Sequence, residues 1–366
     1  MRKKVVVGMS GGVDSSVAAY LLKEAGYEVI GVTMQMWREE GEAFAAADTG
    51  NREGEEPAES GFGTAAQDAK KVADLLGIPH YTMDFTKEFK RSVVDYFVEE
   101  YLCGRTPNPC NVCNRYVKWE ALLMRGRALG ADYIATGHYA RIEKLPNGRY
   151  TVKNAAAGKD QTYALYNLTQ EQLAHTLMPV GSYAKEKIRE MAKQLALPVA
   201  AKPDSQDICF IPDGDYGAFL QREAGGRLAG AGSFVGTDGT VLGEHRGIVH
   251  YTIGQRKGLQ LAMGKPVFVT AIRPKTNEVV IGKNEDLYTD TLFCDRINYM
   301  GAADFAESVR AKIKIRYAHA GTMGVLEKQA DGRIKCTFDV PVRAVTPGQA
   351  AVFYQDDYVL GGGTIL

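Results

Sequence analysis

The sequence predicts an α/β fold, with a doubly wound parallel sheet at the N-terminus, then a small β domain and a C-terminal β-barrel. Up to about residue 205, apolar strand-length runs alternate with amphipathic helical runs, which is the pattern of a parallel sheet covered by helices. Beyond that point short alternating runs between glycine turns follow, which is typical of β domains and barrels. We therefore expect domains at residues 1–204, 205–272 and 273–366.

The first strand–helix–strand unit has the clearest pattern. Residues 3–9, KKVVVGM, contain a short β-branched run without alternation, which predicts a buried parallel strand. Residues 14–26 have helical spacing, with Val17, Leu21 and Leu22 on one side, and Gly26 is positioned to end the helix. A second buried strand is predicted over residues 28–37.

The same alternation continues along the chain. It predicts helices over residues 65–77, 86–104 and 118–130, and strands over 78–85 and 131–140. In a doubly wound sheet the ligand lies at the carboxyl ends of the strands. The glycine-rich loop after the first strand, Met34, and the pair Gly137 and His138 all fall at such ends. We therefore expect a ligand to lie across them.

Composition and charge limit the class of protein. No apolar run reaches the length that spans a bilayer, and glycines interrupt the N-terminal apolar run too early for an export signal, so we expect a cytoplasmic protein. The formal net charge is zero, but residues 39–60 hold eight acidic residues and one arginine, a net charge of −7, which leaves about +7 on the remainder. We interpret the acidic stretch as a solvated surface loop.

The loop at residues 8–17, GMSGGVDSSV, joins the first strand to the first helix. Free N–H groups and the helix dipole favour an anion at such a position. Gly11 and Gly12 would let the backbone close on phosphate oxygens, and the serines at positions 10, 15 and 16 add hydroxyl groups. A plain glycine turn, with Asp14 or Ser15 as the helix N-cap, is the alternative.

The loop lacks the lysine of GxxxxGK[ST] and the spacing of GxGxxG. It resembles the SGGxDS loop of the N-type ATP pyrophosphatases, which implies that ATP, with Mg²⁺, adenylates a carbonyl oxygen and releases pyrophosphate. The motif alone leaves open several enzymes, among them NAD synthetase, GMP synthetase, argininosuccinate synthetase and tRNA thiolases. The resemblance implies that ATP contacts Gly8, Met9, Ser10, Gly11, Gly12, Val13, Asp14, Ser15, Met34 and Gly137.

Six cysteines divide into two groups. Cys110 and Cys113 form a CxxC in what we interpret as a turn made by two prolines, and Cys209 lies in a loop rich in Pro and Asp. Thiols in polar loops are unusual as core residues, and the neighbours of Cys209 include Asp204, Ser205, Gln206 and Asp207. The other three, Cys103, Cys294 and Cys336, lie in hydrophobic stretches and are expected to be buried.

Seven stretches, in order along nearly the whole chain, resemble the bacterial tRNA-specific 2-thiouridylases. They are GMSGGVDSS, GRTPNPCNVCNRYVKW, IATGHYAR, GKDQTYAL, KPDSQDICFIP, RGIVHYTIGQRKGL and AVTPGQAAVFY. The resemblance implies ATP-dependent replacement of the C2 oxygen of a tRNA wobble uridine by sulfur, which yields 2-thiouridine, AMP and pyrophosphate. Only the acidic stretch after Trp37 lies outside the pattern.

The resemblance also implies roles for single residues. Cys113 would be the nucleophile and Cys209 the carrier of a persulfide supplied by a sulfur-donor protein, and turnover would leave a Cys113–Cys209 disulfide for a reductant to open. Asn108, Pro109 and Cys110 would contact the target base. Contacts to tRNA would come from Lys159, Asp160, Gln161, Arg316, Tyr317 and Gln349, and from His138, for which a satisfied loop histidine is the alternative.

One position departs from the best-known members of that family. They have Asp three residues before the nucleophile, where this chain has Cys110. Cys110, Cys113 and Cys209 could therefore hold an iron–sulfur cluster with one iron open to sulfide. A CxxC also suits zinc or a redox pair, so the persulfide relay is the favoured reading and the cluster the alternative.

The stretch RAKIKIRY at residues 310–317 has the alternation of a strand. Arg310, Lys312, Lys314 and Arg316 would lie on one face, and Ala311, Ile313, Ile315 and Tyr317 on the other. Four cations on one face suit an RNA backbone, although a merely solvated face is the alternative. Arg256 and Lys257 add two cations at a turn.

Two other functions remain open at this point. Another N-type ATP pyrophosphatase, such as an amide-forming synthetase, would have no use for Cys113 and Cys209. A non-catalytic RNA-binding protein would not need the intact loop from Ser10 to Ser15.

Overall fold

The computed structural model describes residues 2–37, 64–203, 208–305 and 308–366. It divides into two compact units, one of Met1–Val93 with Asn111–Gln206 and one of Val94–Cys110 with Asp207–Leu366. The acidic stretch 39–60, and the four residues 204–207 beside Cys209, lie outside the described residues. The three-domain division at 204/205 and 272/273 stays a prediction.

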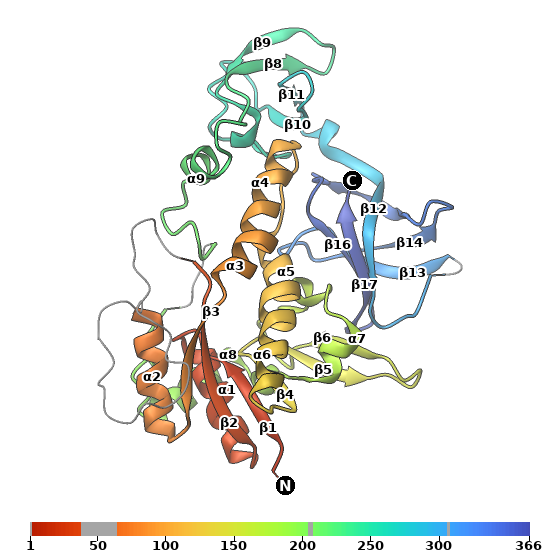
Figure 1. Ribbon diagram of the computed structural model, residues 1–366. Helices are drawn as coiled ribbons and strands as arrows, with labels where there is room; N and C mark the ends of the chain where they lie inside the picture. The colour runs from red at the N-terminus through yellow and green to blue at the C-terminus, as the bar shows by residue number, and fades with distance from the viewer. Residues whose placement is uncertain (1, 38–63, 204–207, 306–307) are drawn as a thin grey trace. The chain divides into compact units, whose positions relative to one another are not determined.

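The first unit is built on a parallel sheet of five strands, as predicted (Figure 1). Their order is β3 (His80–Asp84), β2 (Glu28–Gln35), β1 (Lys4–Gly8), β4 (Tyr133–Ala135) and β7 (Thr176–Leu177), and each neighbouring pair is parallel. Successive strands extend to one side from β1 to β3, and β4 lies on the other side of β1. The reversal of strand order between β1 and β4 creates the crevice where such sheets bind ligands.

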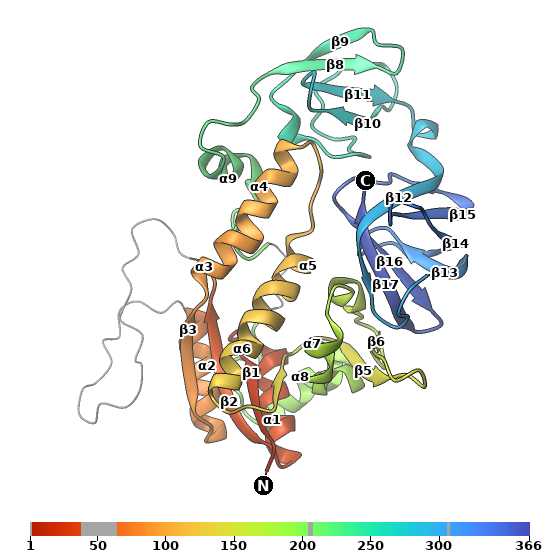
Figure 2. The ribbon, with the colours of Figure 1, turned by 45° about the vertical axis from the view of Figure 1, so that its right-hand side comes forward.

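Helices cover both faces of this sheet (Figure 2). The helices α1 (Val13–Glu24), α2 (Thr64–Leu76) and α8 (Lys185–Gln194) share one core with Val5 and Val7 of β1. Val6 points to the opposite face, where Gly126 of α6 (Leu122–Ala128) packs against it and Ile134. Alternate residues of one strand thus bury themselves under different helices, which explains why the run has no polar alternation.

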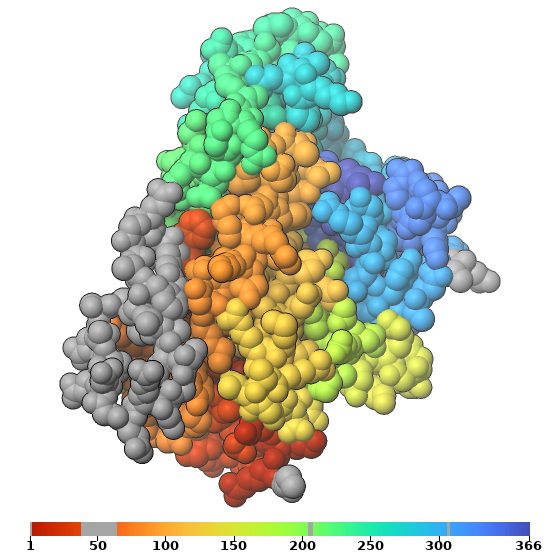
Figure 3. Space-filling view, viewed as in Figure 1, coloured from red at the N-terminus to blue at the C-terminus, as the bar shows by residue number. Residues whose placement is uncertain are grey.

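The chain between β3 and β4 is more helical than predicted. A first run comprises α3 (Thr86–Phe89), a π-helical stretch (Lys90–Val94) and α4 (Asp95–Leu102), in agreement with the helix predicted over 86–104. The second run comprises α5 (Pro109–Cys113), a π-helical stretch (Asn114–Ala121) and α6. In Figure 3 its outer side, coloured yellow, is at the surface, where Tyr116 and Met124 are exposed.

The second run begins at Pro109 and not at residue 118, so the prediction that the CxxC lies in a turn is wrong. The Asn108 side-chain oxygen accepts a hydrogen bond from the Cys110 N–H at 3.1 Å. Proline is favoured at the first position of a helix, because its φ is already helical and it needs no donor there. The Asn-Pro pair therefore starts a helix here and does not close a turn.

The rest of the first unit consists of short elements. They are the hairpin of β5 (Ala140–Lys144) and β6 (Tyr150–Asn154), the 3₁₀ turns Thr162–Leu165 and Pro179–Ser182, and α7 (Gln170–Ala174).

The second unit contains two β structures. The smaller is a four-stranded sheet in the order β10 (Phe268–Arg273), β11 (Glu278–Gly282), β8 (Gly232–Gly236) and β9 (Val241–His245), with 3₁₀ turns at Ile248–His250 and Glu285–Leu287. The helix α9 (Tyr216–Glu223) precedes it and was not predicted, because its two helical turns are too short for periodicity to be recognised.

The larger β structure is the predicted barrel. Its antiparallel strands are β12 (Tyr288–Tyr299), β13 (Val309–Lys314), β14 (Thr322–Lys328), β15 (Ile334–Arg343), β16 (Ala350–Gln355) and β17 (Tyr358–Ile365). Pairing of β12 with β17 closes it. Cys294 and Cys336 are buried in its core, as predicted. Among the described residues of the whole chain, no helix combines the length and apolar character needed to cross a membrane.

Candidate active site

The loop between β1 and α1 requires glycine for steric reasons. Gly11 has φ +67°, and a Cβ there would overlap the Ala65 carbonyl. The helix N-cap is Gly12, which provides no side-chain cap, so the alternative with Asp14 or Ser15 as the cap is wrong. The Ser16 hydroxyl donates to the Gly12 carbonyl at 2.8 Å. The first N–H groups of α1 are therefore available to an anion.

Asp14, in the first turn of α1, is bound by two side chains from distant parts of the sequence. The ammonium of Lys185 lies 2.7 and 2.8 Å from its two carboxylate oxygens, and the Tyr139 hydroxyl donates to it at 2.8 Å. Lys185 and Asp14 are 15% and 22% exposed. The carboxylate is thus neutralised by a lysine and does not repel an anion bound at the same helix end.

Two further lysines surround this loop. Lys202 donates to the Gly11 carbonyl at 3.0 Å and to Asp68 at 2.9 Å. Lys159 lies 5.4 Å from the centroid of the Tyr139 ring, and Lys185 lies 5.5 Å from it. Three ammonium groups against the two carboxylates of Asp14 and Asp68 leave one net positive charge near the helix N-terminus, which suits a polyphosphate.

The carboxyl ends of the neighbouring strands lie beside the loop between β1 and α1, as predicted. A Cβ at Gly137 would lie 2.6 Å from the Asp14 carbonyl carbon and from the Ser15 nitrogen, so the loop after β4 packs directly on the start of α1. Met34 is partly exposed near the end of β2. Met9 and Val13 are buried in the core, so their side chains do not face a ligand.

His138 is held beside this edge by Thr136 and Trp119. Its Nδ1 is 2.8 Å from the Thr136 hydroxyl, and the centroids of its ring and the Trp119 ring are 5.2 Å apart. Desolvation first, and then the charges of Lys118 and Lys159, hold the pKa of His138 well below its usual value. The imidazole is therefore neutral and can both donate and accept a hydrogen bond.

The residues of GKDQ have different environments. Asp160 accepts hydrogen bonds from the Thr162 N–H at 3.3 Å and the Thr162 hydroxyl at 2.9 Å. Gln161 accepts from the Tyr139 N–H at 2.8 Å and donates its own N–H to the Tyr139 carbonyl at 3.0 Å. Gln161 thereby fixes the tyrosine that binds Asp14, and Lys159 lies beside the ring of that tyrosine.

The cysteines differ in exposure. Cys113 is 6% exposed, with its Sγ 3.8 Å from the Met36 sulfur, whereas Cys110 and Cys209 are exposed. Cys103 is exposed as well, so its predicted burial is wrong, because it is the C-cap residue that follows the last turn of α4. In the described part of the chain, no three His, Cys, Asp or Glu side chains are grouped as a metal site.

The predicted basic strand is β13, and its alternation is confirmed over Arg310–Ile315, with Ala311, Ile313 and Ile315 in the barrel core. Arg310 forms a bidentate ion pair with Asp339, with both distances 2.8 Å, while Lys312 is exposed. The strand ends at Lys314. Tyr317 lies beyond it and is 48% exposed, so its predicted place on the apolar face is wrong.

Arg316 and Gln349, two predicted tRNA contacts, line one cavity of about 260 Å³ within the second unit. Its other polar side chains are Thr106, Thr252, Arg343 and Thr346. Arg316 donates to the Arg343 carbonyl at 3.0 Å. Two guanidinium groups and several hydroxyls form a suitable lining for a phosphate or a base edge.

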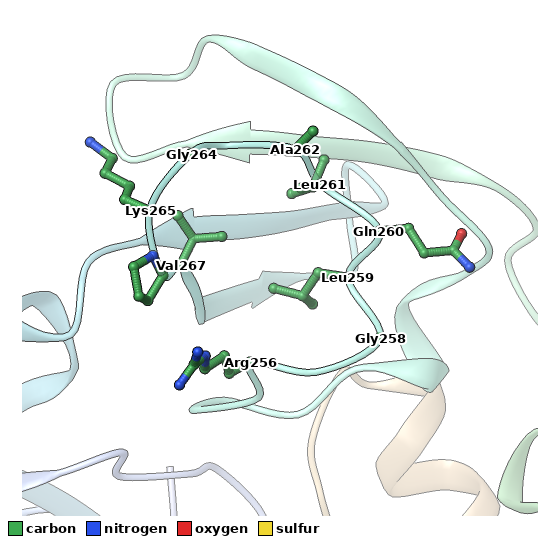
Figure 4. Close-up of a pocket in the computed structure, with 10 residues that line it drawn as sticks. Arg256, Gly258, Leu259, Gln260, Leu261, Ala262, Gly264, Lys265 and Val267 are labelled. Atoms are coloured by element: carbon green, nitrogen blue, oxygen red, sulfur yellow. The ribbon is translucent and has the colours of Figure 1, made fainter.

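A second, more open pocket of about 600 Å³ is formed by the loop of residues 256–267 (Figure 4). Leu259 and Val267 point into the ring that this loop makes, and Lys265 points away from it. Arg256 and Lys257 are exposed, as expected for cations at a turn.

Sequence reasoning missed Lys185, Lys202 and Tyr139. Lys185 is 171 residues from Asp14, and Lys202 is 191 residues from Gly11, so no spacing relates them. Asn111 and Asn114 were missed as well. The side-chain oxygens of both are buried without a hydrogen-bond partner in the described structure. Asn111 lies within the CxxC and Asn114 directly follows it, and this position in the sequence could have identified them.

Comparison with known proteins covers nearly the whole chain. Residues 3–213 match the family described as tRNA methyl transferase HUP domain, residues 217–283 its PRC-barrel domain and residues 289–365 the aminomethyltransferase beta-barrel domain. The chain is 58% identical, over 365 residues, to the tRNA-specific 2-thiouridylase MnmA of Lachnoclostridium phytofermentans, covering 100% of this chain and 99% of that protein. The protein of the same name from Clostridium perfringens is 51% identical over 366 residues, with coverage of 100% and 98%.

Proposed function

This chain belongs to the MnmA family of tRNA-specific 2-thiouridylases, and from that premise we propose that it uses ATP to replace the C2 oxygen of a tRNA wobble uridine with sulfur. The observation that carries the proposal is the combination, in one chain, of an uncapped, lysine-surrounded loop at the switch point of an α/β sheet with a CxxC helix. The products are 2-thiouridine, AMP and pyrophosphate.

The first step activates a poor leaving group. The uracil C2 oxygen attacks the α-phosphorus of ATP, the bond between the α-phosphorus and the bridging oxygen breaks, and pyrophosphate leaves. The N-terminus of α1, Lys185 and Lys159 are the groups we assign to the charge of the departing pyrophosphate. Mg²⁺ would enter with ATP. We assign it no protein ligand, because Asp14 is already paired with Lys185.

The second step transfers sulfur. We propose that the terminal sulfur of a Cys209 persulfide attacks C2 and expels AMP, which leaves C2 joined to Cys209 through a disulfide. The Cys113 thiolate then attacks the Cys209 sulfur, the electron pair returns to the sulfur on C2 as the thiocarbonyl, and a Cys113–Cys209 disulfide remains. A dithiol reductant opens it, and a sulfur-donor protein restores the persulfide. The exposure of Cys209 suits delivery by a second protein.

An iron–sulfur cluster held by Cys110, Cys113 and Cys209 is the alternative, and Cys110 is the observation that favours it. Cys110 and Cys113 are spaced i, i+3 on α5, but Cys113 is buried while Cys110 is exposed. The described residues include no grouped set of three donors. We keep the cluster as the alternative and derive no step through it.

The barrel supplies the candidate tRNA contacts. Arg316 and the exposed Lys312 offer cationic donors to a phosphate or a base edge. An enzyme that modifies tRNA works where tRNA is found, so we also propose a cytoplasmic location.

One experiment distinguishes the proposed function from the two alternatives, an amide-forming synthetase and a non-catalytic RNA-binding protein. The protein is incubated with ATP, a persulfide donor and unmodified tRNA, and pyrophosphate release and 2-thiouridine are measured with and without the tRNA. The proposal expects tRNA-dependent release and formation of 2-thiouridine. An amide-forming synthetase would release pyrophosphate without tRNA, and an RNA-binding protein would release none. Either result would contradict the proposal.

A further inference from the structure

The segment Gly104–Asn108, which leads into the helix that carries Cys110 and Cys113, is held along its length by other parts of the second unit. At its start, the Arg105 N–H donates to the Glu100 carbonyl at 2.9 Å, and the Arg105 guanidinium bonds the buried Glu100 carboxylate at 2.7 Å. At its end, Asn108 accepts from the Cys110 N–H. The segment therefore has little freedom at either end.

The barrel holds the middle of the segment through hydrogen bonds to Thr106. The Thr106 N–H donates to the Pro347 carbonyl at 2.8 Å, and the Gln349 side-chain amide donates to the Thr106 carbonyl at 2.8 Å. The Thr106 hydroxyl donates to the Thr252 hydroxyl at 3.3 Å. Both backbone polar groups of one loop residue are thus satisfied by a single barrel loop.

Close packing accompanies these bonds. Gly348, between the two barrel partners, has φ +91°, and a Cβ there would lie 3.0 Å from the Arg105 Cβ and from the Thr106 nitrogen. Gly104 packs in the same way on the small β-sheet, where an added Cβ would lie 3.0 Å from Ile272 and 3.2 Å from Pro274. The backbones approach so closely that a shift of the barrel loop must move the segment.

The cavity of about 260 Å³ lies next to these hydrogen bonds. Thr106 and Gln349 line it together with Arg316 and Arg343. A polar group of the RNA bound there would contact the same barrel loop that fixes Thr106. The cavity therefore shares Thr106 and Gln349 with the contact that holds the segment preceding Cys110.

We propose that Gln349, through its hydrogen bond to the Thr106 carbonyl, is a positioning residue for the segment that leads to Asn108 and the CxxC. This rests on the proposed function. It gives the barrel a part in the chemical step, and Gln349 a role that does not depend on its contacting the RNA. Gln349 is partly buried, and its donor atom is committed to the Thr106 carbonyl.

The test compares Gln349→Glu with the wild type. Glutamate has the same size but no N–H to donate, so it removes the bond and places a carboxylate against a carbonyl. Hydrogen exchange at the Thr106 amide, followed by mass spectrometry of overlapping peptides, should become faster. Single-turnover formation of 2-thiouridine should fall about 10- to 100-fold, since small misplacement of a reacting group costs up to about two orders of magnitude, while the Kd for tRNA stays unchanged.

Gln329→Glu is the matched control, because it removes the same kind of side-chain amide bond to a backbone carbonyl, that of Glu327, in the same barrel and outside the cavity lining. It should exchange and react like the wild type. Unchanged exchange at Thr106 in Gln349→Glu would overturn the proposal, and so would a raised Kd with an unchanged single-turnover rate, which would make Gln349 an RNA ligand only. The exchange measurement does not depend on catalysis. A wild-type protein that forms no 2-thiouridine would refute the proposed function, but the exchange rate at Thr106 would still test the hydrogen bond from Gln349.

Discussion

Lys185 and Asp14, 171 residues apart in sequence, form a two-contact ion pair of 2.7 and 2.8 Å at the first turn of α1. A carboxylate at a helix N-terminus is stabilised by the helix dipole, yet it would repel a phosphate bound at the same place. The lysine neutralises the carboxylate and so removes that repulsion. The pair therefore makes an acidic residue compatible with an ATP site.

Lys185→Gln should lower tRNA-dependent pyrophosphate release about 10²–10³-fold, the effect typical of removing one group that stabilises charge in the transition state. Asp14→Ala and Ser10→Ala should also abolish adenylation. All three variants should keep their affinity for tRNA. Filter binding with labelled tRNA checks this, and an equal loss of tRNA affinity in a folded variant would contradict the assignment of this loop to ATP.

Gly137→Ala should weaken both folding and ATP binding. The added Cβ would lie 2.6 Å from two backbone atoms of α1, which cannot move independently of the helix, and overpacking of this kind costs about 1–3 kcal/mol. Thermal unfolding and the KM for ATP are the measurements. Gly230→Ala is the matched control, because nothing lies within 4 Å of a Cβ there; equal behaviour of the two variants would exclude a role for this contact.

Charge reversal at Lys312 and Lys314 should weaken tRNA binding and flatten its dependence on salt. Each lost phosphate contact should reduce the log–log slope by about 0.7–0.9. Arg310→Glu should have a smaller effect on the slope, because Arg310 is already paired with Asp339. Lys335→Glu, on β15 and beside Glu327, serves as a control on the same barrel. An unchanged slope in the double variant would mean that β13 is only a solvated face.

Cys113→Ser and Cys209→Ser should each abolish 2-thiouridine formation, whereas Cys110→Ser should retain most activity with a persulfide donor. The reason is that the relay uses only two thiols, while a cluster needs a third ligand. Iron content and 2-thiouridine yield are measured on protein purified without oxygen. Joint loss of iron and activity in Cys110→Ser would favour the cluster, and full activity in either of the first two variants would refute the site.

The cysteine controls follow from the structure. Cys103→Ser tests a thiol that is exposed, as Cys110 is, but lies at the end of α4. Cys294→Ser tests one buried in the barrel core. Both should leave activity and iron content unchanged in folded protein.

Much of the fold could be predicted because its signals are local. The apolar run of β1 and the helical spacing of α1 are properties of neighbouring residues, and the position of the glycine loop between them follows directly. The errors arose where one local signal fits two structures. Asn108-Pro109 suits a turn and also a helix start, and a cysteine in a hydrophobic stretch can still cap an exposed helix end, as Cys103 does.

The sequence by itself therefore determined the α/β architecture, the barrel, and the presence of a glycine-rich loop between β1 and α1. Only the tertiary structure decided which side chains surround that loop and which loop holds Thr106. Lys185, Lys202 and Tyr139 reach α1 from elements far away in sequence, and Gln349 reaches Thr106 from 243 residues away. Such contacts depend on how helices and strands pack, and packing is set by the shape and volume of whole elements, which residue spacing does not encode.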